Sequence, residues 1–124
     1  MLRTWIHTLS AGVFIVASLG SAQPLSSHTA TLEEARTLQK DGNIKEAFER
    51  YERLCLDAAY TGLGAQDALE RAVQCQQRLN QMHAIDPLLE ATVAARPHDW
   101  RMLATVARQY SQVQHAGYII AGEF

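Results

Sequence analysis

Apolar residues along this chain recur at the spacing expected of helices. The clearest run covers residues 44–55, where offsets of 3, 4, 7, 10 and 11 put on one helix face the side chains of Ile44, Ala47, Phe48, Tyr51, Leu54 and Cys55. Asn43 precedes this run, and Glu46 lies three residues further on, which is the spacing of a capping box. The pattern predicts a helix over about 43–57.

A shorter helix is predicted directly before it, over about 31–41. Its own capping box runs from Thr31 to Glu34, and its inward side carries Leu32, Ala35 and Leu38. Asp41-Gly42-Asn43 interrupts the periodicity between the two segments. Two short amphipathic helices joined by a turn that contains Gly form an antiparallel hairpin.

Three more helices are predicted, over about 65–81, 84–95 and 99–114, after a Gly-containing loop at 58–64. The first has one stripe of Ala68, Ala72, Cys75 and Leu79, with Leu69 and Val73 beside it. The inward face of the helix over 84–95 carries Leu88, Leu89, Thr92 and Val93. The last carries at helical offsets Trp100, Leu103, Ala104, Ala107, Tyr110 and Gln114. Pro87 suits a first turn, and Pro97 ends the helix before it.

The spacing within the first hairpin resembles a tetratricopeptide repeat. The matching residues, in order, are Ala35, Gly42, Ala47, Tyr51 and Leu54. The small positions Ala35, Ala72 and Ala107 are 37 and then 35 residues apart, near the repeat length of about 34. The aromatic and the Leu-Gly pair of the consensus first helix are missing. The resemblance implies an all-α fold of about five helices, with antiparallel hairpins stacked as a short solenoid over 31–116.

The start of the chain has the pattern of a secretory signal peptide over 1–22. Arg3 is followed by an uncharged apolar stretch and then by Gly20-Ser21-Ala22, the small residues that signal peptidases require. The alternative is an uncleaved anchor, but the apolar stretch is shorter than the ~20 residues that span a bilayer. We therefore expect an exported protein, periplasmic or secreted, with no membrane association after cleavage and a flexible leader over 23–30.

Composition and motifs narrow the function classes. The net charge of −2 and the lack of a basic stripe do not indicate nucleic-acid binding. The five histidines are scattered, and His98-Asp99 is better explained by Asp99 capping the last helix than by an acid–base pair. No nucleophile motif or Gly-rich phosphate loop is present. We expect no enzyme activity, no cofactor and no metal site.

Cys55 and Cys75 allow two interpretations. Both lie on apolar stripes, which favours buried thiols that pack as small hydrophobic side chains. Export favours a disulfide between them, because the second and third helices are neighbours in the predicted stack. The Cα separation of the two cysteines decides between these interpretations, and it depends on how the two helices pack.

Three stretches resemble the N-terminal helical segment of large exported bacterial proteins of the alpha-2-macroglobulin family. They are DGNIKEAFERYERL, ALERAVQCQQRLNQMHAID, and PHDWRMLATVARQY followed by GYIIAGEF. That family traps proteases or guards the envelope through β-sandwich domains, often with a thioester. Cys75-Gln76-Gln77 lacks the Cys-x-Glu-Gln pattern of that thioester, so this chemistry is not transferred. The resemblance implies a helical leader module of a larger protein.

The tetratricopeptide resemblance also implies a peptide groove lined by the first helix of each hairpin. Spacing from the three alanines places there Arg36, Gln39, Lys40, Gln76, Gln77, Arg101, Arg108 and Gln112. The alternative is that these side chains are only solvated. The apolar residues 117–124 either fold back onto the fifth helix or continue into a longer chain, and we expect continuation.

Three functions follow from this pattern. The first is a protein–protein interaction module at the start of an alpha-2-macroglobulin-like protein, whose partner is another protein, a peptide or further domains of the same chain. The second is a self-contained periplasmic adaptor or chaperone. The third is the fragment of an enzyme whose active site lies beyond Phe124.

Overall fold

The computed structural model describes residues 25–113. This part of the chain is 81% helical and contains no strand, so the predicted all-α fold class is confirmed. The predicted signal peptide at 1–22 and the apolar segment at 117–124 lie outside the described residues. The helices are α1 (Leu25–Lys40), α2 (Ile44–Leu56), α3 (Leu63–Arg78), the 3-10 helix η1 (Met82–Ala84), α4 (Ile85–Ala95) and α5 (Trp100–Gln112).

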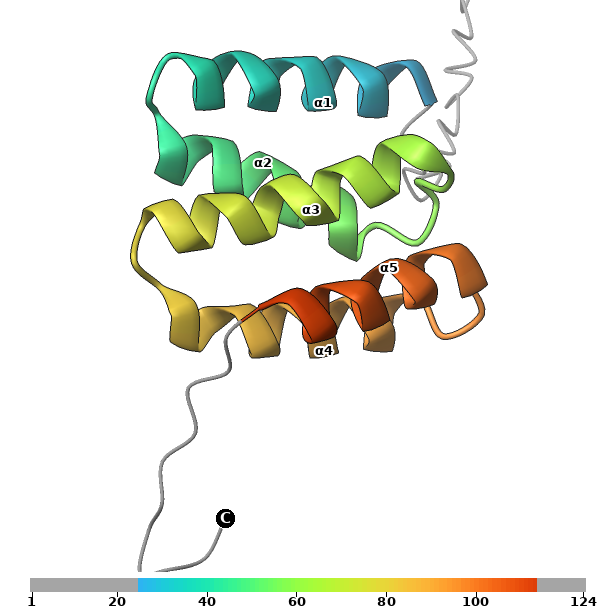
Figure 1. Cartoon of the computed structure of the whole chain (residues 1–124). Helices are drawn as coiled ribbons and strands as arrows, with labels where there is room; N and C mark the ends of the chain where they lie inside the picture. The colour runs from blue at the N-terminus through green and yellow to red at the C-terminus, as the bar shows by residue number, and fades with distance from the viewer. Residues whose placement is uncertain (1–24, 114–124) are drawn as a thin grey trace, which may run out of the picture.

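The helices form two layers. In Figure 1, α1, α3 and α5 follow one another down the molecule, and α2 and α4 lie behind them. α2 packs closely on both α1 and α3, while α5 contacts α3 and α4. α4 also contacts α2, and η1 joins α3 to α4. α3 packs on α2 and α5 more than on α4, so the second hairpin is more open than the first.

The core is built on the predicted face of α2. Tyr51 is 0% exposed, and its hydroxyl donates a hydrogen bond of 2.8 Å to Oε1 of Gln39 on α1. Beside it on α2 are buried Ala47, Leu54 and Cys55, with Ile44 and Phe48 packed at the edge. The period of the apolar residues therefore predicted this helix and its buried side correctly. Gly42 allows the tight turn before it, because its φ is +88°.

The first helix begins earlier than predicted. α1 starts at Leu25, so the flexible leader is wrong for residues 25–30, and Thr31 lies inside the helix instead of capping it. The physical reason is His28, which is 2% exposed and has Nε2 2.7 Å from Oδ2 of Asp57. Its ring also stacks on Tyr60 at a centroid distance of 4.8 Å. These contacts hold the first turns of α1 against the loop between α2 and α3.

The structure corrects the predicted capping box at Asn43 and decides between the two interpretations of the cysteines. Asn43 occupies the N-cap position of α2, but its side chain makes no capping hydrogen bond. Cys55 and Cys75 are both buried and free, so no disulfide joins them in the structure. Burial raises the pKa of the Cys55 thiol to about 12, which keeps it in the unreactive protonated form. Burial also raises the pKa of Cys75.

The buried side of the last helix is not the stripe that has apolar residues at helical offsets in the sequence. Its buried residues are Met102, Thr105, Val106 and Gln109. The predicted stripe lies largely outward instead: Trp100 is 70% exposed, and Ala104 and Ala107 are exposed. Asp99 caps the helix as predicted, because its Oδ1 accepts a hydrogen bond from the backbone N of Met102.

A buried arginine links three helix ends. The side chain of Arg96, which follows α4, is 1% exposed. Its guanidinium donates to the backbone oxygens of Cys55 at 2.6 Å, Leu54 at 2.8 Å and Asp57. It also pairs with Oδ2 of Asp99 at 3.3 Å. A cation at the C-terminal end of α2 satisfies carbonyls that lack partners in the helix and complements the helix dipole.

Candidate functional site

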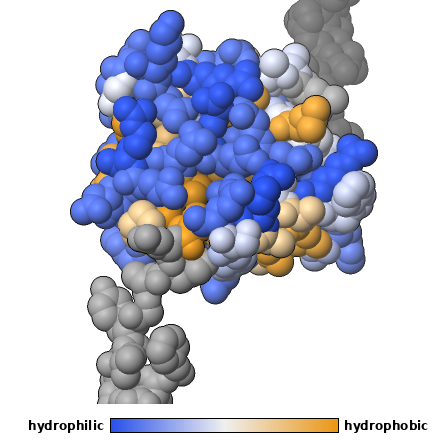
Figure 2. Space-filling view, viewed as in Figure 1, coloured by the Kyte–Doolittle hydropathy of each residue, from blue (hydrophilic) through white to orange (hydrophobic). Residues whose placement is uncertain are grey.

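A groove runs between α3 and α5 and consists of two cavities that meet at Arg108. The first has a volume of about 380 Å³ and lies toward the C-terminal ends of the two helices. The second, of about 430 Å³, lies toward their N-terminal ends. In the space-filling view, hydrophilic side chains cover most of the face over α1 and α3, and apolar ones gather lower down, around α5 (Figure 2).

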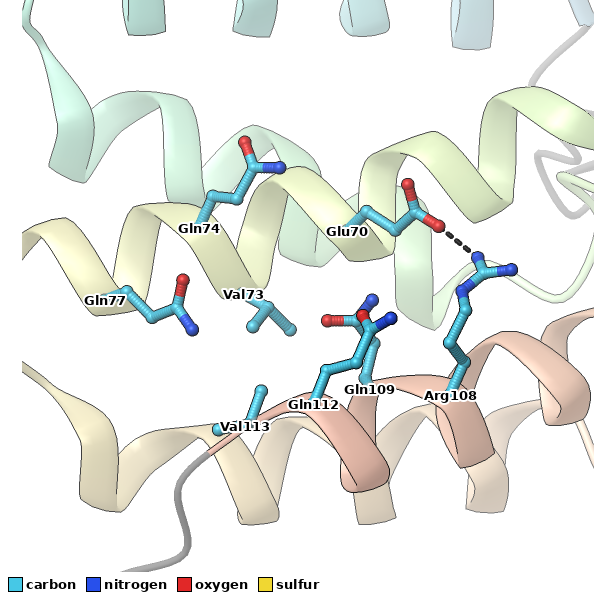
Figure 3. A pocket seen from close by; sticks show the side chains of 8 residues that line it. All are labelled: Glu70, Val73, Gln74, Gln77, Arg108, Gln109, Gln112 and Val113. Atoms are coloured by element: carbon cyan, nitrogen blue, oxygen red, sulfur yellow. Dashed lines mark hydrogen bonds and ion pairs between the residues drawn. The ribbon is translucent and has the colours of Figure 1, made fainter.

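Side-chain amides dominate the first cavity. Gln74 and Gln77 project from α3, and Gln109 and Gln112 project from α5, as Figure 3 shows. The same cavity is lined by Val73 and Val113. Each amide offers two donors and an acceptor, so this lining suits the alternating N–H and C=O groups of an extended backbone.

An ion pair crosses the groove where the two cavities meet. The guanidinium of Arg108 on α5 donates to Oε1 of Glu70 on α3 (Figure 3). Both side chains are partly exposed, at 49% and 38%, so the pair is solvated and open to exchange with another carboxylate. Arg108 therefore supplies a cation at the centre of the groove.

The second cavity is the apolar end of the groove. Leu63 is 80% exposed and Trp100 is 70% exposed, and both line it together with Ala104. The guanidinium carbon of Arg101 lies 5.2 Å from the centre of a Trp100 ring, a cation–π contact. This end combines an open apolar surface with a cation.

The structure brings only half of the predicted groove residues together. Gln77, Arg108 and Gln112 line the amide cavity, and Arg101 lines the apolar end with Arg108. Gln76 does not belong to an exposed lining: it is 3% exposed, and its Nε2 donates to the carbonyl of Ala84 at 3.1 Å.

Two of the other predicted residues, Arg36 and Gln39, lie between α1 and α3. Arg36 donates to Oδ2 of Asp67 at 2.8 Å, and this bond is the main cause that raises the pKa of the arginine. Arg71 donates to Asp67 and to Oε1 of Gln39, the atom that also accepts from Tyr51. These side chains already have partners within the fold. Lys40, the last residue of α1, is exposed and lines neither cavity.

The sequence pattern did not predict the acidic partners of Arg36 and Arg108. Asp67 pairs with Arg36 across 31 positions, and Glu70 pairs with Arg108 across 38. Both separations are near one repeat length of about 34 residues. Residues one repeat length apart lie at similar levels on neighbouring helices of a stack. Residues of opposite charge at that spacing could therefore have predicted these ion pairs from the sequence.

A second polar cluster surrounds Asp57, at the end of α2. The pKa of this carboxyl is lowered, first by its hydrogen bond with His28 and then by the backbone N–H of Ala59. Tyr60 covers His28 and also passes very close to Gly64, where an added Cβ would lie 2.0 Å from the Tyr60 hydroxyl. The cluster is packed and holds two segments together, which is a structural role.

The lowered pKa of Asp57 predicts an acid dependence of stability. A carboxyl with a lowered folded pKa stabilises the protein above its unfolded value, near 3.8, and this contribution disappears as the pH falls through the folded pKa. Urea midpoints measured from about pH 5 down to about pH 2 should fall more steeply in the native chain than in Asp57→Asn. Parallel curves for the two proteins would contradict this assignment.

No family model, curated protein or solved structure matches the chain. Within residues 25–113, no set of three His, Cys, Asp or Glu side chains is placed to hold a metal ion. In the same part of the chain, no helix has the length and apolar content needed to cross a membrane.

Proposed function

We propose that this protein is a protein–protein interaction module that holds an extended peptide segment in the groove between α3 and α5. The observation that carries the proposal is the row of amides from both helices, Gln74, Gln77, Gln109 and Gln112, beside the central cation Arg108. Such a lining has donors and acceptors for a peptide backbone.

The two ends of the groove would bind different parts of the peptide, its main chain at one end and a side chain at the other. At the amide cavity, the glutamines can exchange water for peptide N–H and C=O groups, as in recognition that depends on the main chain. At the apolar end, Leu63, Trp100 and Ala104 can cover an aliphatic or aromatic side chain of the peptide. Exposed Trp and Arg are the residue types that most often dominate binding energy at interfaces.

The layered arrangement supports a finer proposal, that the module is a short tetratricopeptide-like solenoid. α1, α3 and α5 form one layer, and contacts link α1 to α3, α2 to α4, and α3 to α5. In such stacks the first helices of the hairpins line the concave surface, and the groove is lined by α3 and α5, which would be two of those first helices. The open second hairpin is the main departure from a regular stack.

The sequence resemblance adds a context to this proposal. The three stretches similar to exported alpha-2-macroglobulin-like proteins favour an envelope or secreted location and a module placed before larger domains. In that context the bound peptide belongs either to a later domain of the same protein or to a separate envelope protein. A self-contained periplasmic adaptor or chaperone would use the same groove.

The test is affinity for a peptide selected on the chain from a random-peptide display library. Replacing both Gln74 and Gln112 with Ala should weaken the binding of that peptide by roughly 5- to 150-fold, because each lost hydrogen bond contributes about 0.5–1.5 kcal/mol. Fluorescence anisotropy with the labelled peptide measures the dissociation constant directly.

The matched control is Gln81→Ala, which makes the same chemical change at an exposed position outside the groove. It should leave the dissociation constant unchanged. Equal weakening by Gln81→Ala, or none with the double variant, would show that the peptide does not occupy the α3–α5 groove.

A further inference from the structure

Within residues 25–113, the apolar end of the groove is lined by two cations and by no carboxylate. The charged residues of this described lining are Arg101 and Arg108, and both are exposed. They are seven positions apart on α5, close to two helical turns, so they lie on the same side of the helix about 10 Å apart. With Glu70 of the amide cavity, the described groove carries two positive charges and one negative, whereas the whole chain carries a net charge of −2. The groove is therefore a cationic site on an acidic protein.

One of these two arginines has no acidic partner within the described part of the chain. Arg101 takes part in none of the ion pairs formed by residues 25–113. At the neighbouring contact between α1 and α3, by contrast, Asp67 pairs with both Arg36 and Arg71. A single carboxylate thus serves two arginines elsewhere in this fold. A ligand carboxylate between Arg101 and Arg108 would do the same in the groove.

The ion pair between Glu70 and Arg108 can be exchanged at little cost (Figure 3). Its side chains are 38% and 49% exposed, and ion pairs this exposed change an equilibrium constant by about 5-fold or less. A ligand carboxylate that reached both Arg108 and Arg101 would form two such pairs and break one. The exchange is therefore favourable by about the contribution of one pair, and the released Glu70 is solvated.

We propose that Glu70 holds Arg108 in the absence of ligand, and that the bound peptide displaces it with an Asp or Glu side chain placed between Arg101 and Arg108. The peptide carries a large apolar residue two positions from that acid. This inference rests on the proposed peptide groove and names the class of peptide that the groove binds.

The separation of two positions follows from helix geometry. The midpoint between Arg101 and Arg108 falls between positions 104 and 105, about 7 Å along α5 from Trp100. In an extended peptide, alternate side chains share one face and are about 6.6–6.8 Å apart. With the acid at the midpoint, the apolar side chain therefore reaches the surface formed by Trp100 and Leu63. On the other side of the acid, the peptide main chain continues along the amide cavity.

Peptide selection followed by one substitution in the peptide tests the ligand class. Peptides selected on the chain from a random display library should be enriched in Asp or Glu two positions from Leu, Phe or Trp. One such peptide is the probe, synthesised with an amidated C-terminus so that only side chains supply carboxylates. Replacing its acid with the corresponding amide should weaken binding by about 1.5- to 5-fold, the net loss of one exposed ion pair. In the double variant Arg101→Gln with Arg108→Gln, the same replacement should have no effect.

The variant Glu70→Gln tests the displacement. It should tighten the acidic probe by about 1.5- to 5-fold, because no carboxylate of the protein then competes for Arg108, and leave the affinity of the amide version unchanged. If Glu70 had only a structural role, its replacement would weaken the probe or leave it unchanged. The matched control is Glu49→Gln, which removes the same charge at an exposed position of α2 outside both cavities and should not change the affinity.

Two results would overturn this inference and leave the peptide groove in place. One is a set of selected peptides without an acidic preference whose binding still depends on Gln74 and Gln112. The other is a Glu70→Gln variant that binds the acidic probe no more tightly than the native chain does. A library that yielded no peptide, or an acidic peptide insensitive to the replacement of both glutamines, would instead overturn the groove and this inference together.

Discussion

Replacing Arg96 with Ala is expected to lower the free energy of unfolding by about 3–5 kcal/mol. The guanidinium is the hydrogen-bond partner of backbone oxygens of Leu54, Cys55 and Asp57, and it pairs with Asp99. Its removal leaves buried carbonyls without donors, and each such group costs about 1–3 kcal/mol. The measurement is a urea titration followed by circular dichroism at 222 nm.

Two variants make this result specific. Arg53→Ala removes an exposed arginine from the last turn of the same helix, α2, and should change stability by less than about 1 kcal/mol. Arg96→Lys keeps the charge but loses the planar fork of donors. Its free energy of unfolding should therefore lie between those of the native chain and Arg96→Ala. A loss in Arg96→Ala no larger than that in Arg53→Ala would mean that the three helix ends are held by other contacts.

Replacing Tyr51 with Ala is expected to cost about 3–5 kcal/mol, the range for deleting a buried aromatic ring. Tyr51 is 0% exposed and packs in the core formed by α1, α2 and α3. Its deletion also removes one of the two donors to Oε1 of Gln39, the other being Arg71. Thermal and urea denaturation of the variant measure the loss.

Tyr51→Phe separates packing from hydrogen bonding. It keeps the ring and removes only the hydroxyl, so the expected loss is about 0.5–1.5 kcal/mol. If Tyr51→Phe were as destabilising as Tyr51→Ala, the polar network with Gln39 and Arg71 would be the main contribution instead of the ring. If both variants were near native stability, the assigned core would be wrong.

Periodicity predicted the helices well because it reports a property of each segment alone. The predicted helix over 43–57 is observed as Ile44–Leu56, and that over 84–95 is observed as Ile85–Ala95. Pro97 and Gly42 mark boundaries through backbone restrictions that operate in any context. Tertiary contacts are not needed for these features.

The site was harder to predict, because it depends on which helices become neighbours. Arg36 and Arg108 occupy comparable places in the sequence pattern and both pair with a carboxylate on α3, yet only Arg108 lines the groove. Gln76 and Gln77 are adjacent, but one is buried and the other lines a cavity. Spacing from an alanine does not resolve such differences.

The sequence by itself determined the helical class, the turns and the buried side of α2, because these follow from a local period and from Gly and Pro. The tertiary structure alone decided the early start of α1, through His28 and Asp57, and the rotation of α5. α5 has apolar residues on two sides, Met102 and Val106 on one and Leu103 and Ala107 on the other. A period cannot choose between two such sides, and the choice was made when α5 packed on α3 and α4 with Met102 and Val106 buried.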